Sequence, residues 1–504
     1  MKLNHDVCYE AIKTNDARFD GVFFVAVKTT GIYCRSVCKV PAPKSENCTF
    51  FNSAAESEAN GFRPCLRCRP ELAPQYSEFD QGKELVKLIV EYFELHEYGQ
   101  KLIARCAAEL GISPRHLNRV FKNGLGVSPK EYIMTKRLLR AKSLLTDTNL
   151  SITQIATTCG FGSPSRFHDA LKKRYQLTAS DIRKEYKSKN KLDSIKIKLY
   201  FRPPYDWESM LNFFRLRAIP GIEFITDTGI YRRSLNIHHN GQNHVGWIEI
   251  KPKINNNHFE VKLSRSLGPV MLQVSYLVKK ALDLGALPDQ LPTEFPKGIR
   301  LPGCFDGFEM SVRAILGQQI TVKAATTISG RVVDALGKEV ETPWPEINYI
   351  FPEPKDILRL GEKAFDVLGE SGVIRTRSAS IIEIANGIET GNIVFTGSPE
   401  ELKRSLLAIK GIGDWTAEYL SMRGLSWPDA FPVTDIVIKN RLLALLKSDS
   451  GQYINEIEDL SPYKLNKLYI LKAEQYAEKY RPWRSYLTLA LWRDAIKEDH
   501  DDMC

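Results

Sequence analysis

Hydrophobic and polar residues follow two different periods along the chain, and each period predicts a different kind of element. Residues 21–27 (GVFFVAV) form a short apolar run typical of a buried strand. Residues 85–93 instead carry apolar side chains at helical spacing, opening a mostly helical region. Apolar residues alternate with polar ones again at 195–201 and 259–263, so residues 194–280 are predicted as antiparallel sheet.

Helical spacing returns after Asp306, which is a possible N-cap because Glu309 follows three residues later. Further helices are predicted over residues 308–320, 378–388, 402–409, 415–422 and 482–492. The fold class predicted is multidomain α+β. Its parts are a small cysteine-containing domain (1–76), an all-α domain (82–187), an antiparallel β-sheet/α domain (194–290) and an all-α domain (300–496).

Composition narrows the class of protein without naming a function. The 504 residues exceed what one hydrophobic core organises, and 43% hydrophobic with 26% charged residues excludes a disordered chain. Neither a long apolar run nor a secretory signal is present, so we expect a cytoplasmic protein that contacts no membrane. The net charge of +10 favours a polyanionic partner only mildly.

Four of the ten cysteines lie in two short-range pairs. Cys34 and Cys38 are four residues apart, and Cys65 and Cys68 are three residues apart. Four thiols in two such pairs are the donor set of a tetrahedral zinc site, so one Zn²⁺ is predicted here. Unconnected buried cysteines and a disulfide pair are the alternatives, and the absence of an export signal argues against the disulfide.

The helical region repeats a pattern about fifty residues apart. Residues 107–122 and 156–172 each contain a helix with a small residue, a Gly turn, a Ser that can cap, and a second helix with a basic face. This pattern predicts two helix-turn-helix units, whose second helices can enter successive turns of the major groove. A merely structural helical bundle is the alternative.

A second DNA-binding pattern lies near the C-terminus. Residues 406–417 have the form of a helix-hairpin-helix, in which the tight turn at Gly411 and Gly413 exposes backbone amides to a phosphate, often with help from a monovalent cation. About twenty residues later, Asp435 begins an apolar helix. An ordinary N-cap is the alternative interpretation of this carboxylate.

The cysteine region resembles a known family. Residues 29–38 (TTGIYCRSVC) and 61–68 (GFRPCLRC) are similar to the N-terminal domain of Ada-type adaptive-response proteins, although that family commonly has Pro-Ser where this chain has Ser36 and Val37. The resemblance implies that Cys34 accepts a methyl group from a DNA methylphosphotriester, and that all four cysteines bind zinc. Candidate phosphate contacts are Arg35, Arg63 and Arg67.

The repeated helical pattern resembles the DNA-binding domain of AraC-type regulators over about 100 residues. This resemblance implies sequence-specific binding to promoter DNA, and an activator of this type is expected to contact RNA polymerase. The residues expected to face DNA are Arg115, His116, Asn118 and Arg119 in the first unit and Ser165, Arg166 and His168 in the second.

The chain from about 194 to 496 resembles AlkA-type DNA-3-methyladenine glycosylases of the helix-hairpin-helix superfamily. The motifs that carry it are YFRPPYDW (200–207), RAILGQQ (313–319), GIGDWTAEY (411–419) and RPWRSY (481–486). It implies Asp435 as the catalytic carboxylate, Gln319 as the wedge into the duplex, and a base pocket formed by Trp415, Tyr419, Trp492 and Gln318. Gln319 and Ile436 depart from the family pattern, which has an apolar wedge and a Tyr there.

Together these patterns predict a fusion that senses and repairs alkylated DNA as a monomer. Where glycosylases with lyase activity carry a Lys, this chain has Trp415, so hydrolysis to an abasic site is expected. The alternative function is a transcription regulator whose glycosylase half is a non-catalytic DNA clamp. A second methyltransferase acting on O6-methylguanine is not expected, because no cysteine lies in a Pro-Cys-His-Arg motif.

Overall fold

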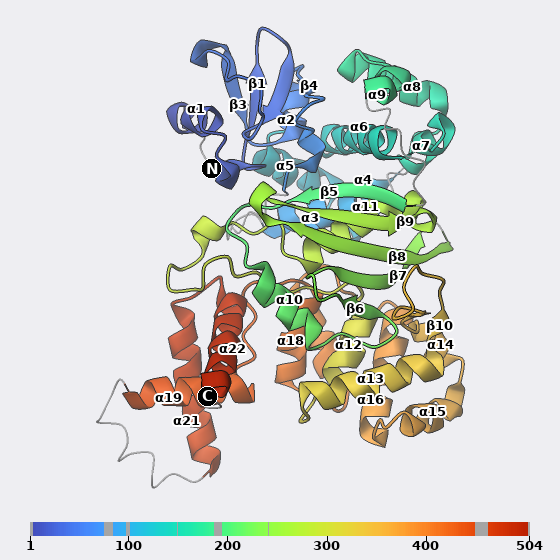
Figure 1. The fold of residues 1–504 in the computed structure, drawn as a ribbon, viewed down its shortest axis with the longest axis vertical. Helices are drawn as coiled ribbons and strands as arrows, with labels where there is room; N and C mark the ends of the chain where they lie inside the picture. The colour runs from blue at the N-terminus through green and yellow to red at the C-terminus, as the bar shows by residue number, and fades with distance from the viewer. Residues whose placement is uncertain are drawn as a thin grey trace. The chain divides into compact units, whose positions relative to one another are not determined.

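The computed structural model describes residues 4–74, 84–96, 101–148, 150–185, 194–239, 241–448 and 462–501 (Figure 1). The chain forms two compact units. The first unit comprises Met1–Pro203, Thr226–Lys279 and Leu284–Asp289, and the second comprises Pro204–Ile225, Lys280–Asp283 and Gln290–Cys504. Among the described residues, no helix has the length and apolar character needed to span a membrane.

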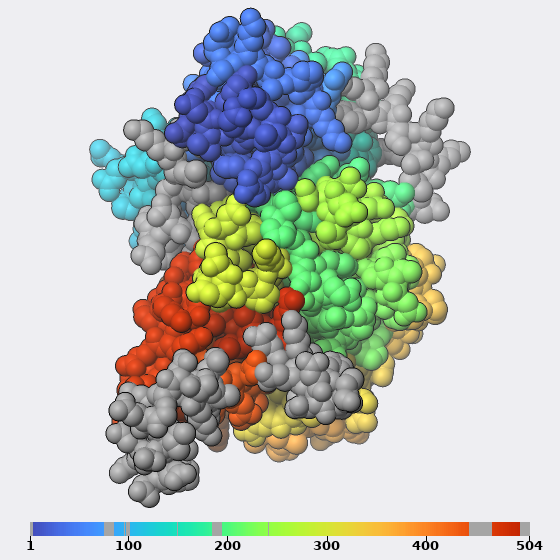
Figure 2. Space-filling view, turned by 60° about the vertical axis from the view of Figure 1, so that its left-hand side comes forward, coloured from blue at the N-terminus to red at the C-terminus, as the bar shows by residue number. Residues whose placement is uncertain are grey.

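The cysteine-rich domain is a four-stranded sheet with short helices, and Figure 2 shows it in dark blue as a compact lobe. The predicted strand at 21–27 is β1 (Phe24–Val27), whose four residues are all buried. The strand order is β3-β1-β2-β4, with β2 and β4 parallel. The remaining elements are α1 (His5–Lys13), β2 (Ile32–Arg35), β3 (Cys48–Phe51), α2 (Ala54–Ala59), β4 (Arg63–Pro64) and the 3-10 turns η1 (Ala17–Phe19), η2 (Ser45–Asn47) and η3 (Pro70–Leu72).

The next region is helical, and its two repeated patterns form the predicted helix pairs. Ser113 and Ser163 cap the second helix of each pair, accepting hydrogen bonds from the amides of His116 and Arg166. The long helix α6 separates the two pairs. The helices are α3 (Glu84–Leu95), α4 (Leu102–Glu109), α5 (Pro114–Leu125), α6 (Pro129–Asp147), α7 (Ile152–Thr158), α8 (Pro164–Tyr175) and α9 (Ala179–Glu185).

The predicted sheet has the strand order β5-β9-β8-β7-β6. Alternation sets its buried face: Phe259, Val261 and Leu263 of β9 are fully buried, with polar residues between them. The pairs β5–β9, β9–β8 and β8–β7 are antiparallel, as expected. The strands are β5 (Ser194–Tyr200), β6 (Glu223–Ile225), β7 (Tyr231–His239), β8 (Gln242–Lys253) and β9 (His258–Ser264), followed by α11 (Met271–Ala281).

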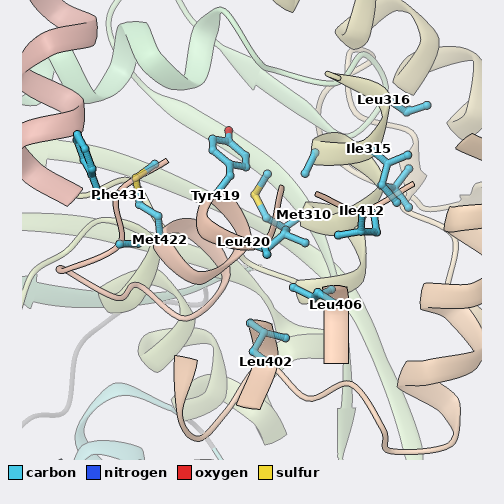
Figure 3. Close-up of a cluster of buried hydrophobic side chains, with 14 of the residues drawn as sticks. Met310, Ile315, Leu316, Leu402, Leu406, Ile412, Tyr419, Leu420, Met422 and Phe431 are labelled. Atoms are coloured by element: carbon cyan, nitrogen blue, oxygen red, sulfur yellow. The ribbon is translucent and has the colours of Figure 1, made fainter. Parts of the chain in front are cut away.

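The second unit is mainly helical, and its core gathers apolar side chains from α12, α17 and α18 (Figure 3). Asp306 caps α12 and accepts a hydrogen bond from the amide of Glu309, as the sequence predicts. Its main helices are α10 (Trp207–Arg215), α12 (Gly307–Leu316), α13 (Val322–Leu336), α14 (Pro354–Leu358), α15 (Ala364–Glu370), α16 (Arg375–Glu389), α17 (Pro399–Leu407), α18 (Asp414–Gly424), α19 (Ile436–Ser448), α21 (Pro462–Glu478) and α22 (Arg484–Asp501). A short ladder pairs β10 (Lys338–Glu339) with β11 (Tyr349–Ile350).

Candidate functional sites

The two cysteine pairs meet although 26 residues separate them. Strand β2 carries Cys34, and its parallel pairing with β4 places Cys65 beside it, where the Cys65 amide donates to the Tyr33 carbonyl at 2.9 Å. The Sγ atoms of Cys34, Cys38, Cys65 and Cys68 all lie within 4.8 Å of one another. A tetrahedral site with Zn–S bonds of about 2.3 Å needs sulfurs about 3.8 Å apart, so this donor set fits Zn²⁺.

The chemistry of the cluster also suits a cation. The pKa of the Cys34 thiol is raised, first by hydrogen bonding with Cys38 and then with Cys65 and Cys68, and burial and the charge of Cys68 act in the same direction. Four thiolates held together without a cation therefore carry an energetic penalty. A divalent ion held between the sulfurs removes that penalty. All nine cysteines that the structure describes are free thiols, so none forms the disulfide considered above.

The three arginines near the cysteines lie in different environments. Arg35 is only 2% exposed, and its Nε donates to Asp20 at 2.8 Å within a buried ion pair. The expectation that Arg35 contacts a phosphate is therefore wrong for this structure, because burial and pairing withdraw its charge. Arg67 is exposed and Arg63 is half-buried.

The second helices of the two helix-turn-helix pairs present polar faces to solvent. On α5, Arg115 and Arg119 are exposed, while Leu117 and Phe121 are buried on the opposite face. On α8, Arg166 is exposed and Phe167 is buried. The other residues expected to contact DNA lie on the same two helices. Asn118 and Ser165 are exposed, and His116 and His168 are half-buried.

Asp435 lies at the start of α19 with both carboxylate oxygens occupied. Oδ2 accepts a hydrogen bond from the indole Nε1 of Trp415 at 2.9 Å, and Oδ1 accepts one from Nε1 of Trp492 at 3.0 Å. Oδ1 also accepts from the amides of Val437 and Ile438, so Asp435 is an N-cap as well. The residue is 9% exposed. Two aromatic side chains thus fix a nearly buried carboxylate.

The aromatic rings near Asp435 form a connected cluster. Trp415 stacks on Tyr419 with centroids 5.1 Å apart, and Tyr419 lies 6.2 Å from Trp492. Sequence reasoning missed two members. Phe213 of α10 stacks on Trp492 at 6.4 Å, and Arg423 donates to the Tyr419 hydroxyl at 2.8 Å. The position of Arg423, four residues after Tyr419 on one helix, is the signal that could have found it.

Two arginines change the pKa of a tyrosine in this cluster. Burial would raise the pKa of Tyr419, but Arg423 and then Arg217 outweigh it and lower that pKa overall. Arg423 is nearly buried, with its guanidinium donating to the carbonyls of Pro302 and Gly303. The phenol of Tyr419 is therefore held in place by a fixed cation.

The hairpin before α18 has the expected tight turn. Gly411 has φ +91°, and its neighbour Lys410 offers a carbonyl that accepts from Ser380 Oγ at 2.9 Å. Gln318, expected in the base pocket, donates through Nε2 to the carbonyl of Gly411 and to Thr416 Oγ1, each at 3.0 Å. Its amide nitrogen thus contacts the hairpin.

The two departures from the family pattern are both at the surface. Gln319 is exposed in the left-handed region with φ +54°, in the turn between α12 and α13. Ile436, next to Asp435, is 65% exposed. Both side chains are therefore accessible to solvent, and Ile436 offers apolar surface beside the carboxylate.

Sequence models of four families match consecutive parts of the chain. They are the metal binding domain of Ada over residues 7–71, a helix-turn-helix domain over 106–185, the AlkA N-terminal domain over 196–306, and the HhH-GPD superfamily base excision DNA repair protein over 312–461. Their order is the order of the predicted fusion.

Three relatives cover different lengths of the chain. A probable bifunctional transcriptional activator/DNA repair enzyme AlkA of Mycobacterium tuberculosis is 29% identical over an alignment of 511 positions. The alignment covers 98% of this chain and 97% of that protein. DNA-3-methyladenine glycosylase 2 of Escherichia coli is 32% identical, over 58% of this chain and 95% of its own length. The bifunctional transcriptional activator/DNA repair enzyme AdaA of Bacillus subtilis is 36% identical, over 35% of this chain and 82% of its own.

Proposed function

Because this chain belongs to the AlkA family of DNA-3-methyladenine glycosylases over its C-terminal part and to the Ada family of activator/repair enzymes over its N-terminal part, we propose that it repairs alkylated DNA and activates transcription in response to the damage. It excises alkylated purines such as 3-methyladenine and 7-methylguanine. It also accepts methyl groups from DNA methylphosphotriesters on Cys34. The observation that carries the excision activity is the Asp435 carboxylate held by two indole N–H groups.

The charge of the substrate explains why excision suits this site. Alkylation at N3 or N7 makes the purine cationic, so it leaves the sugar with little acid assistance. The bond between C1′ and the base nitrogen breaks, and its electron pair leaves with the purine, which becomes neutral. Positive charge develops on the sugar, a water oxygen bonds to C1′, and the water's proton passes to bulk solvent. Asp435 stabilises the developing charge and orients that water. The faces of Trp415, Tyr419 and Trp492 attract the flipped cationic base, each contributing roughly 0.5–2 kcal/mol.

This chain has no amine at the one position where glycosylases with lyase activity carry a lysine. Trp415 stands at the position of the lyase lysine, so the product is an intact abasic site and the enzyme is a monofunctional hydrolase. Duplex binding uses the hairpin amides near Gly411 and Gly413 together with the exposed Gln319. A monovalent cation at the hairpin stays a prediction, and its ligands would be carbonyl oxygens that Ser380 and Gln318 do not already use.

Methyl acceptance uses the half-buried sulfur of Cys34. Cys34 Sγ forms a bond to the methyl carbon, the carbon–oxygen bond of the phosphotriester breaks, and the phosphate oxygen leaves with the negative charge. A Zn²⁺ bound by Cys34, Cys38, Cys65 and Cys68 would keep the sulfur deprotonated near neutral pH. The thioether product is stable, so each protein molecule reacts once.

The regulatory half of the proposal concerns DNA and the transcription machinery. The exposed Arg115, Arg119 and Arg166 support binding of α5 and α8 to promoter DNA. Contact with RNA polymerase follows from the activator role, and a monomeric chain with two recognition helices suffices to read two successive turns of the groove. We propose that the protein acts in the cytoplasm, where DNA lies in bacteria such as those that carry the three relatives.

The glycosylase proposal is tested by replacing Asp435→Asn, which keeps the side chain's size and removes its charge. We expect release of 3-methyladenine from methylated duplex DNA to fall about 100-fold or more, because charge stabilisation in the transition state is lost. Duplex binding, measured by fluorescence anisotropy, should remain. Asp366→Asn, which changes an exposed carboxylate on α15, is the control. Undiminished excision by the Asp435 variant would leave a regulator with a non-catalytic DNA clamp.

A further inference from the structure

A buried carboxylate outside both reaction sites joins three elements of the first unit. Glu58 lies on α2, and its side chain is 1% exposed. Its Oε1 accepts hydrogen bonds from the hydroxyls of Tyr33 at 3.1 Å and Tyr175 at 2.9 Å, while Oε2 accepts from Thr135 Oγ1 at 2.9 Å. Arg174 Nη1 lies 3.6 Å from Oε2. We name these five residues the Glu58 cluster.

The members of the cluster come from parts of the chain with different proposed tasks. Tyr33 belongs to strand β2 and directly precedes Cys34. Thr135 belongs to α6, the helix between the two helix-turn-helix pairs, and Tyr175 is the last residue of the recognition helix α8. Tyr33, Thr135 and Tyr175 are each at most 2% exposed. One carboxylate therefore connects the cysteine-bearing strand with a helix expected to bind DNA.

Alternation along β2 makes this connection direct. Tyr33 and Arg35 point into the protein and are buried, whereas Cys34 between them is half-buried and faces the other cysteines. A change at the Cys34 sulfur that moves β2 also moves the Tyr33 hydroxyl against Glu58. Glu58 holds the Tyr175 hydroxyl through the same oxygen atom.

A second set of contacts holds the cysteine-rich domain on α6 without Glu58. Lys142 donates to Glu71 Oε1 at 2.7 Å, and the Arg69 guanidinium pairs with Asp147 at 2.6 Å. Arg69 follows Cys68 directly, and Lys142 is fully buried. Losing the Glu58 hydrogen bonds therefore leaves the domain anchored to α6 and affects mainly the position of α8.

The energetics indicate a role in orientation. Burial raises the pKa of Glu58 to about 7 although Thr135, Tyr175, Arg174 and Tyr33 all act to lower it. An apolar side chain would fill the same space without the desolvation penalty. A carboxylate instead accepts directional hydrogen bonds, which fix the orientations of the three hydroxyl groups that donate to it.

We propose that Glu58 is a positioning residue that transmits the methylation state of Cys34 to the recognition helix α8, through Tyr33 on one side and Tyr175 on the other. This inference rests on the proposed function, in which Cys34 accepts the methyl group and α8 binds DNA. The regulation it adds is mechanical. It acts alongside the loss of negative charge when a zinc-bound thiolate is methylated.

The test compares full-length wild type, Glu58→Gln and Glu56→Gln. Glu56 lies on the same helix, and within the described part of the chain its side chain bonds only the nearby Asn52 amide, so it is the matched control. Each protein is treated with a duplex oligonucleotide carrying one methylphosphotriester, and mass spectrometry counts the methyl groups on Cys34. Affinity for a mixed-sequence duplex is then measured by anisotropy before and after methylation. Amide hydrogen exchange in α8 is recorded on the same samples.

We expect all three proteins to accept one methyl group. Methylation should raise the DNA affinity of wild type and Glu56→Gln, and this rise should be at least threefold smaller in Glu58→Gln. The change in α8 amide exchange that methylation causes in wild type should be absent from Glu58→Gln. A wild-type gain in Glu58→Gln would overturn the proposal. If wild type itself accepts no methyl group, the proposed function fails instead.

A second pair of variants keeps the test decisive if Glu58→Gln does not fold. Tyr33→Phe and Tyr175→Phe each remove one hydroxyl and keep the ring. If both hydroxyls act through Glu58, their effects on the methylation-dependent gain are not additive, and the double variant resembles either single one. Additive effects would contradict the proposal.

Discussion

At the scale of single residues, Asp435 is an N-cap, and we propose that it is also the catalytic carboxylate, two roles that the sequence presented as alternatives. It caps α19 through the amides of Val437 and Ile438, and it also accepts from the indoles of Trp415 and Trp492. The resemblance to the glycosylase family implied that the acid and the aromatic residues share one site. It did not predict that the indole edges bond the carboxylate, for which we propose an orienting function, because hydrogen-bond direction depends on side-chain rotamers.

Removing an indole N–H tests that function. Trp415→Phe keeps an aromatic face but leaves Asp435 Oδ2 without its donor, so the carboxylate is less well oriented. We expect single-turnover excision of 7-methylguanine to slow about 10- to 100-fold, as loss of a hydrogen bond to a charged group costs about 1.5–3 kcal/mol. Trp344→Phe, outside the aromatic cluster, is the control. A wild-type rate for Trp415→Phe would show that the indole N–H has no part in orienting Asp435.

Arg35 illustrates what the sequence could not reveal at this scale. Its place between Cys34 and Cys38 made it a candidate phosphate contact, yet it pairs with Asp20, fifteen residues earlier. Its guanidinium also donates to the carbonyl of Cys68. Local sequence gives the identity of a charge but not its distant partner, so burial of a charged residue is hard to predict.

At the scale of elements, helix existence was predicted better than helix ends. The helix expected over 415–422 is α18 (Asp414–Gly424), and that expected over 378–388 is α16 (Arg375–Glu389). The helix expected to reach residue 320 ends at Leu316, because Gly317 caps it and Gln319 adopts a positive φ. Capping and turn geometry fix the ends, and these are weaker signals than periodicity.

The hairpin turn gives a prediction at this scale. Gly411 has φ +91°, and a Cβ there would lie 2.7 Å from Ser380 Oγ. Gly411→Ala is expected to destabilise the second unit by about 1–2 kcal/mol from backbone strain alone, and to weaken binding to undamaged duplex DNA. Thermal unfolding and anisotropy measure the two effects. Gly369→Ala in α15, where the added Cβ meets no atom within 4 Å, should be neutral or stabilising; equal effects at both positions would contradict the strain argument.

At the scale of the whole molecule, the Glu58 cluster predicts a pH dependence. The pKa of Glu58 is raised from 4.5 to about 7 in the folded protein, so between these values the folded state binds more protons than the unfolded state. Protonated Glu58 therefore adds to the free energy of unfolding below pH 4.5. This contribution, at most about 3 kcal/mol, is lost as the pH rises to 7. Hydrogen exchange in α8 at pH 5 and pH 7.5, corrected for intrinsic rates, measures it. Glu58→Gln should lack the part of the pH dependence that Glu58 contributes. The same pH dependence in wild type and Glu58→Gln would rule out that contribution.

Charge predicts a second property of the whole molecule. A zinc ion with four thiolates carries about two net negative charges, and methylation of Cys34 removes one of them. The methylated protein should bind DNA from upstream of its own coding sequence more tightly, with a steeper dependence of affinity on salt. Titrations at several salt concentrations compare it with Cys34→Ala treated identically. Equal affinities and slopes for wild type before and after methylation would eliminate the electrostatic switch.

The central claim is that two separate chemistries occur in one chain, and one duplex can test both. It carries a single methylphosphotriester and a single 7-methylguanine. Wild type should gain one methyl group on Cys34 and release the damaged base, as followed by mass spectrometry and chromatography of one sample. Cys34→Ala should lose only the first reaction and Asp435→Asn only the second. Release of the base by Asp435→Asn at the wild-type rate, or a methyl group found on Cys38 instead of Cys34, would contradict the account.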